Sequence, residues 1–520
     1  MLRHFLHLMM ISFAMSCLPT SGQMVGTINM QFGESEGAIS LPSTNEKTAA
    51  IIRSIEGGGF YTTQSHVHPA SNQTEVRRFS REGAPDKAFG DAGIRAIALE
   101  GSVLDFQVDS DRNLFLCGYV QRGRKKDVWV LKLKEDGRTD PEFGIQGVVT
   151  LTIQEQDVAQ RLRILSSGHL LIAGTTYTPS QLERDLFVIK LDAKGRMDLR
   201  FGHRGSAIID LSKDDRLKDF QLTEDGRMVL AGNSRPNRLS RFSLVRLLEN
   251  GRKDPSFGLG GTQIMTVGNG QSYLQAMQLL PDGNIVVAGN ARMNPADPGF
   301  DLVVIRLLPE GQYDPSFANH GTFSYDMGGV DYFGDLTMQP DQQMIISGMN
   351  GKEVQVFRVR QNGKLDPTYG QKGVCRIDGS ERITSVRSVL NSNEHLLLST
   401  ASATGSKIYS LFGNPQLPFL DELLDFDWSS EEEDGISYSG LQFSDDIQID
   451  AWLGGSIFSE NEPATGTESI LPITKHIRFF AHLALDEDHR YTFVWDSEGQ
   501  AHWYWNGSFQ NSWDLLNHKK

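Results

Sequence analysis

The chain has 520 residues, of which 39% are hydrophobic and 22% charged, with 52 glycines and 19 prolines. This length exceeds one ordinary domain of roughly 100–200 residues, and the composition excludes a disordered or collagen-like chain. The formal net charge of −15 argues against a nucleic-acid partner, because phosphate binding requires clustered Lys and Arg. Three cysteines exclude a disulfide-stapled framework.

Residues 1–22 have the pattern of a secretory signal peptide. A basic start at Arg3 and His4 precedes a mostly apolar run over residues 5–15, which is too short for a bilayer-spanning helix of ~20 residues. Small residues follow, and cleavage after Ser16 or after Gly22 fits them. Residues 14–17 also resemble a weak bacterial lipobox, which would make Cys17 a lipid anchor.

This pattern predicts an exported protein that is secreted, periplasmic or held at the cell surface, without a transmembrane segment. The alternative is an apolar tail that is not removed and packs on the domain.

A turn motif recurs from residue 24 to residue 413. Its clearest copy is Asp140-Pro141-Glu142-Phe143-Gly144, with Gly147 after it. Asp accepts backbone hydrogen bonds, Pro fixes its own φ, the ring fills a core and glycine permits positive φ. Copies follow each other at spacings of 52 to 60 residues, and their aromatic residues are Phe32, Phe89, Phe143, Phe201, Phe257, Phe317 and Tyr369.

Each period contains the residues of four short strands. An alternating apolar run precedes each motif, as at 128–133, 186–191, 242–248 and 302–308, and a run ending in a small residue and Gly lies further upstream, as at 114–118, 170–174, 228–232, 285–289 and 344–348. Asp-Gly pairs at 225–226 and 282–283 predict hairpin turns. A short strand after each motif and one before the hairpin complete the period.

These periods predict an all-β chain: a seven-bladed β-propeller of four-stranded blades over residues 24–413, followed by a small C-terminal β domain. The alternative arrangement is an open β-solenoid, because repeat proteins need not close.

The pattern Gly-x-x-Asp-Pro-x-Phe-Gly-x-x-Gly, with its small-residue-Gly strand about thirty residues upstream, resembles the bacterial delta-60 repeat β-propeller family. Single copies depart from it at Asn29, Met30, Lys87, Leu199, Ala318 and Tyr369. The resemblance implies a secreted or surface-exposed bacterial propeller, and it implies no catalytic residue.

Six basic residues each stand eight positions before a motif Asp: Arg78, Lys132, Lys190, Arg246, Arg306 and Arg358. Stabilisation is needed in every repeat, whereas a chemical step is rarely needed six times. We therefore expect each cation to pair with the Asp of its own blade or to cover the neighbouring sheet. The alternative is an anion-binding ring.

The fifth residue after the last motif Gly is expected on the innermost strand, near a central channel. In chain order these residues are Pro42, Ala98, Thr152, Asp210, Thr266, Asp326 and Asp378. Asp210, Asp326 and Asp378 are therefore candidates to converge on a hard cation such as Ca²⁺. The alternative is three solvated residues at strand ends. Cys375 is expected on the same innermost strand of the last blade, and Cys117 in the core.

Residues 421–520 differ from the rest, with 20 acidic against 5 basic residues and six of the seven tryptophans. We expect an acidic linker over 414–440 and a small β domain over 441–520, with a hairpin around Asn506-Gly507. Segments 447–452, 481–484 and 503–507 faintly resemble a concanavalin-like laminin-G jelly roll. The tryptophans either form its core or present platforms for sugar rings or a protein.

The function predicted from these features is an exported, non-enzymatic propeller scaffold that binds a protein or a glycan at the cell surface. No phosphate-cradling Gly-x-x-x-x-Gly-Lys-Ser/Thr loop and no His-Glu-x-x-His zinc motif is present in the sequence. The alternative is a propeller enzyme, a hydrolase or lyase, that uses channel carboxylates.

Overall fold

The computed structural model describes residues 27–33, 37–42, 49–55, 57–68, 71–98, 100–180, 183–236, 238–269, 271–294, 299–392, 395–412, 428–433, 436–441, 480–486, 489–495, 500–505 and 508–514. Within these ranges, no helix is long and apolar enough to cross a bilayer. The chain divides into two compact units, one over Met24–Gln416 and one that contains the strands from residue 428 onward. The predicted signal segment 1–22, with Cys17, lies outside the described residues.

The first unit consists of short antiparallel strands, which confirms the all-β prediction. In chain order they are β1 (Ala38–Leu41), β2 (Ile51–Ser54), β3 (Phe60–His68), β4 (Ser71–Phe79), β5 (Ile94–Ala98), β6 (Gly101–Val108), β7 (Leu114–Arg122), β8 (Lys125–Leu133), β9 (Val148–Leu151), β10 (Gln156–Ile164), β11 (Leu170–Thr178), β12 (Glu183–Leu191), β13 (Ser206–Ile209), β14 (Arg216–Leu222), β15 (Met228–Ser234), β16 (Arg241–Leu247), β17 (Thr262–Met265), β18 (Ser272–Leu279), β19 (Ile285–Ala291), β20 (Asp301–Leu307), β21 (Thr322–Tyr325), β22 (Tyr332–Met338), β23 (Met344–Asn350), β24 (Glu353–Val359), β25 (Val374–Asp378), β26 (Ser385–Leu390), β27 (Leu396–Ala401) and β28 (Ser406–Leu411).

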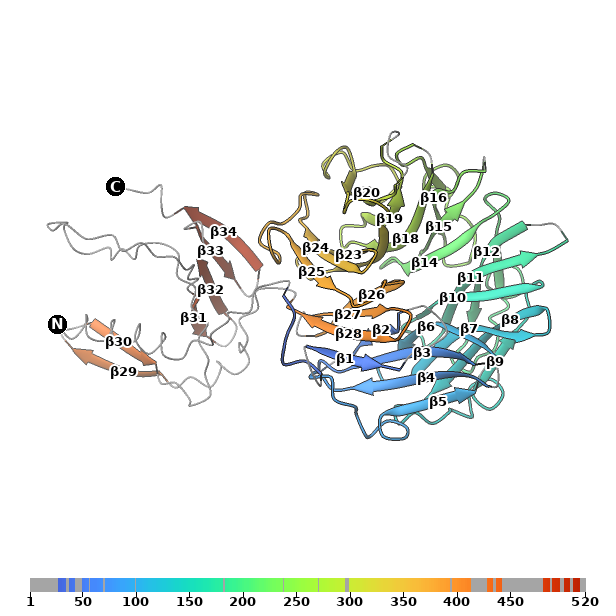
Figure 1. Cartoon of the computed structure of the whole chain (residues 1–520), viewed down its shortest axis with the longest axis horizontal. Helices are drawn as coiled ribbons and strands as arrows, with labels where there is room; N and C mark the ends of the chain where they lie inside the picture. Colours follow the sequence, from blue (N-terminus) through green and yellow to red (C-terminus); the bar gives the residue numbers. More distant parts are fainter. Residues whose placement is uncertain are drawn as a thin grey trace. The chain divides into compact units, whose positions relative to one another are not determined.

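Four consecutive strands make one sheet, as predicted for each period. The sheets β2–β5, β14–β17, β18–β21 and β22–β25 are separate, whereas β6–β9 and β10–β13 are joined by one parallel pairing of Gln156 with Lys126. The remaining sheet has the order β1-β28-β27-β26, so the N-terminal strand completes the sheet of the last three strands of this unit. Ala38 pairs with Tyr409 and Leu41 with Ser406, and Figure 1 shows β1 in blue beside β28 in orange.

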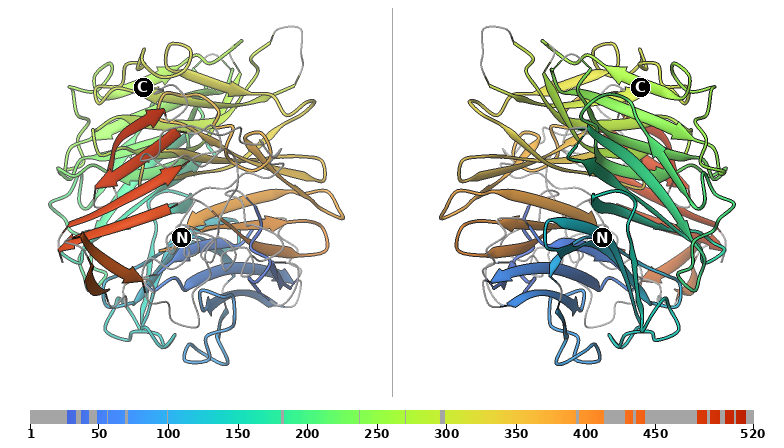
Figure 2. Two further views of the ribbon diagram at one scale, coloured as in Figure 1. Left: turned by 90° about the vertical axis from the view of Figure 1, so that its left-hand side faces the viewer. Right: turned by 90° about the vertical axis from the view of Figure 1, so that its right-hand side faces the viewer.

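The first strands of the sheets are β2, β6, β10, β14, β18, β22 and β26. Each contacts the first strand of the sheet that follows, and β26 contacts β2. The sheets therefore follow one another around a common axis with their first strands innermost (Figure 1). Figure 2 gives two side views of the same ribbon.

The expectation that the strand after each motif is innermost is wrong. Those strands, among them β13, β21 and β25, lie at the opposite edge of their sheets. In every sheet but the last, the chain enters at the axis and leaves at the outer edge, and in the last sheet β1 forms the outer edge. The turn motif therefore lies at the periphery. Cys375 is accordingly on the outer strand β25, and it is buried and free, as is Cys117 of β7.

The motif aromatic residues all fill the interior between sheets, as predicted. Phe32, Phe89, Phe143, Phe201, Phe257, Phe317 and Tyr369 are each at most 2% exposed. The glycine after the ring is required by the turn. At Gly144 the φ is +57°, and an added Cβ would lie 2.3 Å from the Val148 carbonyl oxygen. This is the conformation that glycine adopts without strain.

Ala318 occupies that glycine position in its motif, with a φ of +46°. An L-residue with a Cβ is strained in this region, so we expect Ala318→Gly to raise the free energy of unfolding by about 0.5–1 kcal/mol. Thermal unfolding of the variant measures the change. The matched control is Gly144→Ala, which should destabilise, and a loss of stability in Ala318→Gly would contradict the assignment of strain.

The six predicted pairs of a basic residue with its motif Asp are confirmed. The distances between the charged atoms are 3.0 Å for Arg78–Asp86, 2.9 Å for Lys132–Asp140, 3.6 Å for Lys190–Asp198, 2.8 Å for Arg246–Asp254, 2.7 Å for Arg306–Asp314 and 2.7 Å for Arg358–Asp366. These cations belong to the structure of the turn, and they do not form an anion-binding ring.

The second unit contains a two-stranded sheet of β29 (Trp428–Glu433) with β30 (Ile436–Leu441), within and just beyond the segment 414–440 that was predicted as a linker. It also contains an antiparallel sheet of β31 (Phe480–Asp486), β32 (His489–Trp495), β33 (Gln500–Trp505) and β34 (Ser508–Asp514). Trp505 pairs with Ser508, which confirms the predicted hairpin. Segment 447–452 lies outside the described residues, and the jelly-roll resemblance stays a prediction.

Candidate functional site

Charged side chains from several sheets meet at the axis. In β6, β10, β14 and β22 the pairing register shifts just before Asp105, Arg161, Asp219 and Asp335, respectively. Such a bulge bends the strand and re-aims the side chain that follows it. Arg53 of β2, Arg163 of β10, Lys218 of β14 and Arg387 of β26 join these four residues, and we call the eight residues the axial cluster.

The three carboxylates of the axial cluster each connect two neighbouring sheets. The backbone N–H groups of Leu162, Met277 and Ser388 donate to Asp105 at 3.0 Å, to Asp219 at 3.0 Å and to Asp335 at 2.9 Å. Each donor lies on the first strand of the next sheet. These carboxylates therefore have a structural role, because they satisfy buried backbone donors across a sheet boundary.

Three arginines of the axial cluster are held by these carboxylates. Arg53 forms an ion pair with Asp105, and the Nε of Arg161 lies 3.1 Å from Asp219. Arg163 lies between the two acids, at 3.4 Å from Asp105 and 3.7 Å from Asp219. The contacts join β2, β6, β10 and β14 at the axis.

Lys218 has no such partner. In the part of the chain that the structure describes, its ammonium donates no hydrogen bond and forms no ion pair. Burial lowers its pKa, and the positive charges of Arg387, Arg161 and Arg216 lower it further, to about 8. An amine perturbed in this way is a mark of functional sites in proteins.

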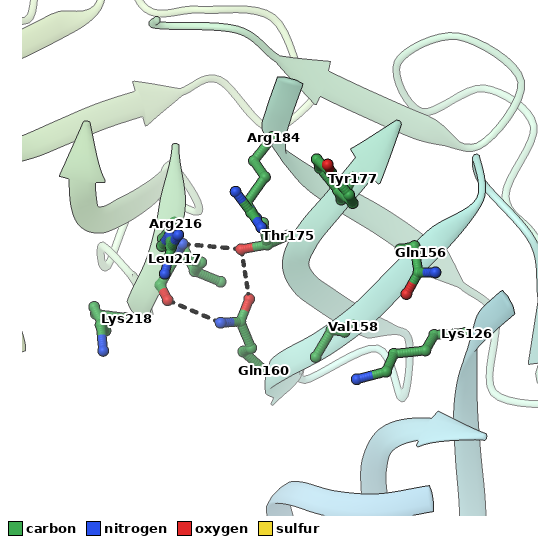
Figure 3. Close-up of a pocket in the computed structure, with 10 residues that line it drawn as sticks. All are labelled: Lys126, Gln156, Val158, Gln160, Thr175, Tyr177, Arg184, Arg216, Leu217 and Lys218. Carbon is green, nitrogen blue, oxygen red and sulfur yellow. Dashed lines mark hydrogen bonds between the residues drawn. The ribbon is translucent and has the colours of Figure 1, made fainter. Parts of the chain in front are cut away.

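A pocket of about 360 Å³ lies beside the axis, between β8, β10–β12 and β14, and it is shown in Figure 3. Four cations line it: Lys126, Arg184, Arg216 and Lys218. The polar residues of the lining are Gln156, Gln160, Thr175 and Tyr177, and the apolar ones are Val158 and Leu217. We call this site the cationic pocket, because none of its ten lining residues is acidic.

Hydrogen bonds fix the floor of the cationic pocket. Thr175 donates its hydroxyl to Gln160 at 2.8 Å and accepts the Leu217 N–H at 3.0 Å, and Gln160 donates to the Leu217 carbonyl at 2.9 Å (Figure 3). These bonds connect β10 and β11 to β14, so the pocket spans a boundary between two sheets. A site built on rigid strands can hold its ligand groups in place without reorganising.

The pocket cations are placed by neighbouring aromatic and acidic groups. Lys126 lies 4.1 Å above the ring of Tyr119, and Arg184 lies 4.3 Å above the ring of Tyr177. Asp214, which does not line the pocket, pairs with Arg184 at 2.9 Å and with Arg216 at 3.0 Å. This one carboxylate also pairs with Arg235 at 3.1 Å, outside the lining, so it serves three arginines and the pocket keeps an excess of positive charge.

The structure does not bring Asp210, Asp326 and Asp378 together. They belong to or follow the outer strands β13, β21 and β25 of three different sheets, because the motif lies at the periphery and not at the axis. The predicted Ca²⁺ site of three converging carboxylates is therefore not formed by these residues.

Two of the three aspartates instead lie in separate local groups. Carboxylate oxygens of Asp185, Asp210 and Asp215 lie within 4.8 Å of one another, as do those of Asp301, Asp326 and Asp331. Asp215 accepts the N–H groups of Leu211 and Ser212 at 2.7 and 2.9 Å, so it caps the turn between two sheets. Burial is the main cause that raises its pKa, to about 6.

The comparisons with known proteins concern the fold. A family model described as a "Domain of unknown function (DUF5122) beta-propeller" matches residues 223–257 and 280–317, two stretches that each end at a motif Phe. The first unit of the chain is a β-propeller. Its four-stranded sheets are blades, and its first strands surround the propeller axis. No curated protein matches the sequence.

Several solved structures are similar to this chain at low sequence identity. The propeller domain of the Trilobed protease from Pyrococcus furiosus is 9% identical with a TM-score of 0.39, covering 72% of this chain and 95% of that one. The polysaccharide lyase Uly1 is 9% identical with a TM-score of 0.40, covering 77% and 95%. Pyrococcus horikoshii acylaminoacyl peptidase is 9% identical with a TM-score of 0.38, and the chain covers 57% of its length.

Sequence reasoning missed both the axial cluster and the cationic pocket. A signal for the axial cluster exists, because Asp105, Arg161, Asp219, Asp335 and Arg387 recur at one place in successive periods, interrupted by Ala276. The residue type changes from blade to blade, so the column does not look like a motif. The pocket combines residues from three blades and has no sequence signal.

Proposed function

We propose that the chain is a closed propeller of seven blades that acts as an exported binding scaffold, and that its cationic pocket binds an acidic saccharide. Contact of β26 with β2 and the pairing of β1 with β28 support the closed ring. The basic and apolar start of residues 1–22 supports export.

The positive charge of the residues that line the pocket is the main support for this proposal. Lys126, Arg184, Arg216 and Lys218 face a space that no lining carboxylate neutralises. Such a site favours a ligand with negative charge, because cations held in a partly desolvated pocket attract anions more strongly than cations in open water. Lys126 supports this further, because within the described part of the chain its ammonium donates no hydrogen bond to protein.

The remaining lining residues favour a saccharide among anionic ligands. Gln156, Gln160, Thr175 and Tyr177 supply amide and hydroxyl groups that both donate and accept hydrogen bonds, as sugar hydroxyls do. The volume of about 360 Å³ lies within the range of small-ligand pockets, roughly 300–1,000 Å³. A ring that carries a carboxylate or sulfate would use both the cations and the neutral polar groups.

Charge reversal at Lys126 tests the site. We expect trigalacturonate to bind the full chain and Lys126→Glu to weaken it by about tenfold or more in calorimetry at physiological salt, because one hydrogen bond to a charged group contributes about 1.5–3 kcal/mol. Lys125→Glu is the matched control, because the adjacent Lys125 does not line the pocket.

Three outcomes would reject the proposal as stated. Equal weakening in both variants would indicate long-range charge attraction without a site. Equal binding of the neutral maltotriose would remove the role of the cations. Binding of an oligoglutamate peptide without binding of trigalacturonate would assign the pocket to a protein partner.

A further inference from the structure

Three aspartates meet at the boundary between two neighbouring blades. Asp185 of β12 and Asp210, which follows β13, belong to one blade, and Asp215, just before β14, belongs to the next. The register explains why the first two meet, because Leu186 pairs with Ile209 and the next position on each strand is an aspartate. One carboxylate oxygen of each aspartate lies within 4.8 Å of the other two. We call these three residues the acidic triad.

Two carboxylates of the acidic triad receive no donor from the protein. Among the residues that the structure describes, neither the carboxylate of Asp185 nor that of Asp210 accepts a hydrogen bond or forms an ion pair. Burial and the charge of Asp210 both raise the pKa of Asp185 and of Asp215. Like charges this close repel one another, so the triad is stabilised by a cation placed between its oxygens.

Other blade boundaries neutralise the same positions with protein groups. Where β16 pairs with β17, the register leads to Arg241 opposite Thr266, and the arginine donates to the threonine. Where β8 pairs with β9, it leads to Asp127 opposite Thr152, and this single carboxylate accepts the Thr152 hydroxyl at 2.7 Å. One boundary thus holds a protein cation in this place, and another holds one acid with its own donor. In the described part of the chain, Asp185 and Asp210 have neither.

A fourth oxygen, the hydroxyl of Ser234, belongs to the same place. Ser234 ends β15 and is 0% exposed, and within the described ranges its Oγ has no hydrogen-bond partner. Arg216 pairs with Asn233, so the register sets Ser234 directly opposite Asp215. Residues directly opposite each other in an antiparallel pair have their side chains on the same face of the sheet.

Two other blades show where a side chain at the position of Ser234 points. Thr176 lies opposite Asp157 and donates its hydroxyl to that carboxylate at 2.5 Å. Asn350 follows the pairing of β22 with β23 to a place opposite Asp331, and it donates to that carboxylate at 3.3 Å. The Ser234 hydroxyl is therefore aimed at the acidic triad without a protein partner there. Because buried hydroxyls are almost always partnered, a ligand beside it is expected.

We infer that the acidic triad binds one Ca²⁺ ion at this boundary, with Asp185, Asp210 and Asp215 as carboxylate ligands and the Ser234 hydroxyl as a further oxygen. Ca²⁺ takes roughly six to eight oxygen ligands at about 2.3–2.6 Å, so two oxygens on one ion can lie up to ~5 Å apart. The oxygens of the triad fit this limit. Asp210 is exposed, so water can complete the shell. Mg²⁺ fits less well, because it demands octahedral geometry at about 2.0–2.1 Å.

The test is thermal unfolding of the full chain, freed of divalent ions with EDTA and exchanged into EDTA-free buffer, with and without CaCl₂ at constant ionic strength. We expect Ca²⁺ at about a hundredfold its Kd to raise the unfolding midpoint by about 2 °C or more, because it binds only the folded state. Asp185→Asn and Asp210→Asn should lose this shift. Asp378→Asn is the matched control that should keep it, because Asp378 is an exposed aspartate at the equivalent place in another blade.

The midpoints in Ca²⁺-free buffer separate loss of a ligand from a folding defect. Asp210→Asn removes a repelling charge, so it should unfold there at the same temperature as the wild type or higher. A lower midpoint would contradict the account of an unpaired acid.

Three further outcomes would overturn the inference. An equal Ca²⁺ shift in the wild type and Asp210→Asn would assign the ion elsewhere, as in the acidic residues 421–520. Loss of the shift in Asp326→Asn alone would move the ion to the second group of aspartates. An equal shift with MgCl₂ at the same concentration would reject the choice of Ca²⁺.

Discussion

Replacing Asp254 with Asn should lower the free energy of unfolding by about 3–5 kcal/mol, because a buried guanidinium would lose its charged partner. Asp254 and Arg246 are 5% and 7% exposed in their side chains, and their charged atoms are 2.8 Å apart. Chemical denaturation of the full chain, followed by far-UV circular dichroism, measures the loss.

The size of this effect follows from how much Arg246 connects. Besides Asp254, it donates to the Pro309 carbonyl of the next blade at 2.6 Å and to Ser256 at 2.9 Å. It also lies 4.8 Å above the ring of the motif residue Phe257. Loss of the Asp254 charge therefore loosens the Arg246 side chain and disturbs a turn, a core ring and a boundary between blades.

The contribution of the Arg246–Asp254 pair to the free energy of unfolding should also depend on acid. Burial alone would raise the pKa of Asp254, but hydrogen bonds from Ser256 and the charges of Arg227 and Arg246 outweigh it and hold the pKa below its ordinary value. A carboxyl with a lowered pKa stabilises the fold above the unfolded-state pKa near 3.9 and loses this contribution as the pH falls further. The difference between wild type and Asp254→Asn should therefore shrink below about pH 4.

The chain contains its own control for this prediction. Arg78 and Asp86 form the equivalent pair in another blade, at 3.0 Å, but their side chains are 12% and 30% exposed. Solvent-exposed pairs contribute less than about 1 kcal/mol, so Asp86→Asn should be mild. Equal losses in Asp254→Asn and Asp86→Asn would show that burial does not set the strength of these pairs.

Lys218→Met should have the opposite sign and raise the free energy of unfolding at pH 7 by about 1–3 kcal/mol in phosphate-free buffer. The substitution removes a half-buried ammonium whose pKa is lowered by burial and by the charges of Arg387, Arg161 and Arg216, and that has no acceptor among the residues the structure describes. A side chain that costs stability and is nevertheless present fits a role in binding an anion. Thermal and chemical unfolding at several pH values measure the gain.

The pH dependence gives this prediction a second readout. Lys218 has a pKa of about 8 in the folded chain, and an unfolded lysine titrates near 10.4, so the unfolded state binds more protons between these values. The wild type therefore gains stability as the pH rises from 8 to about 10, and its difference from Lys218→Met narrows there. Lys125→Met, at an exposed position, should change stability by less than about 0.5 kcal/mol. A gap that stays constant across this range would contradict the account.

The contacts within one blade could be predicted from the sequence. A basic residue stands eight positions before the motif Asp in six copies of the pattern, as Arg246 does before Asp254. The strand and the turn that carry these two residues follow each other directly in the sequence, so the spacing alone identifies the pair. The hairpin at Asp225-Gly226 was predictable for the same reason, and Gly226 has a φ of +79°.

The sequence could not predict which edge strand of each blade lies at the axis. An alternating strand has the same pattern whether it lies at the axis or at the periphery, so Asp210 and Asp378 were placed at the wrong edge. Only contacts between repeats distinguish the two edges, as when Arg163 of β10 reaches Asp219 of β14. The cationic pocket has the same origin, because Lys126 and Arg216 are brought together by blades that are far apart in the sequence.

The pairing of β1 with β28 also constrains the order of events during synthesis. Leu41 leaves the ribosome among the first residues of the propeller, and its partner Ser406 leaves among the last. At roughly 5–20 residues per second, β1 waits about 20–70 s for its partner strand. Until then the open edge of a β-strand is available to other chains, which is a known hazard for aggregation. Among the described strands of the propeller, β1 thus waits longest for its partner while the chain is being made.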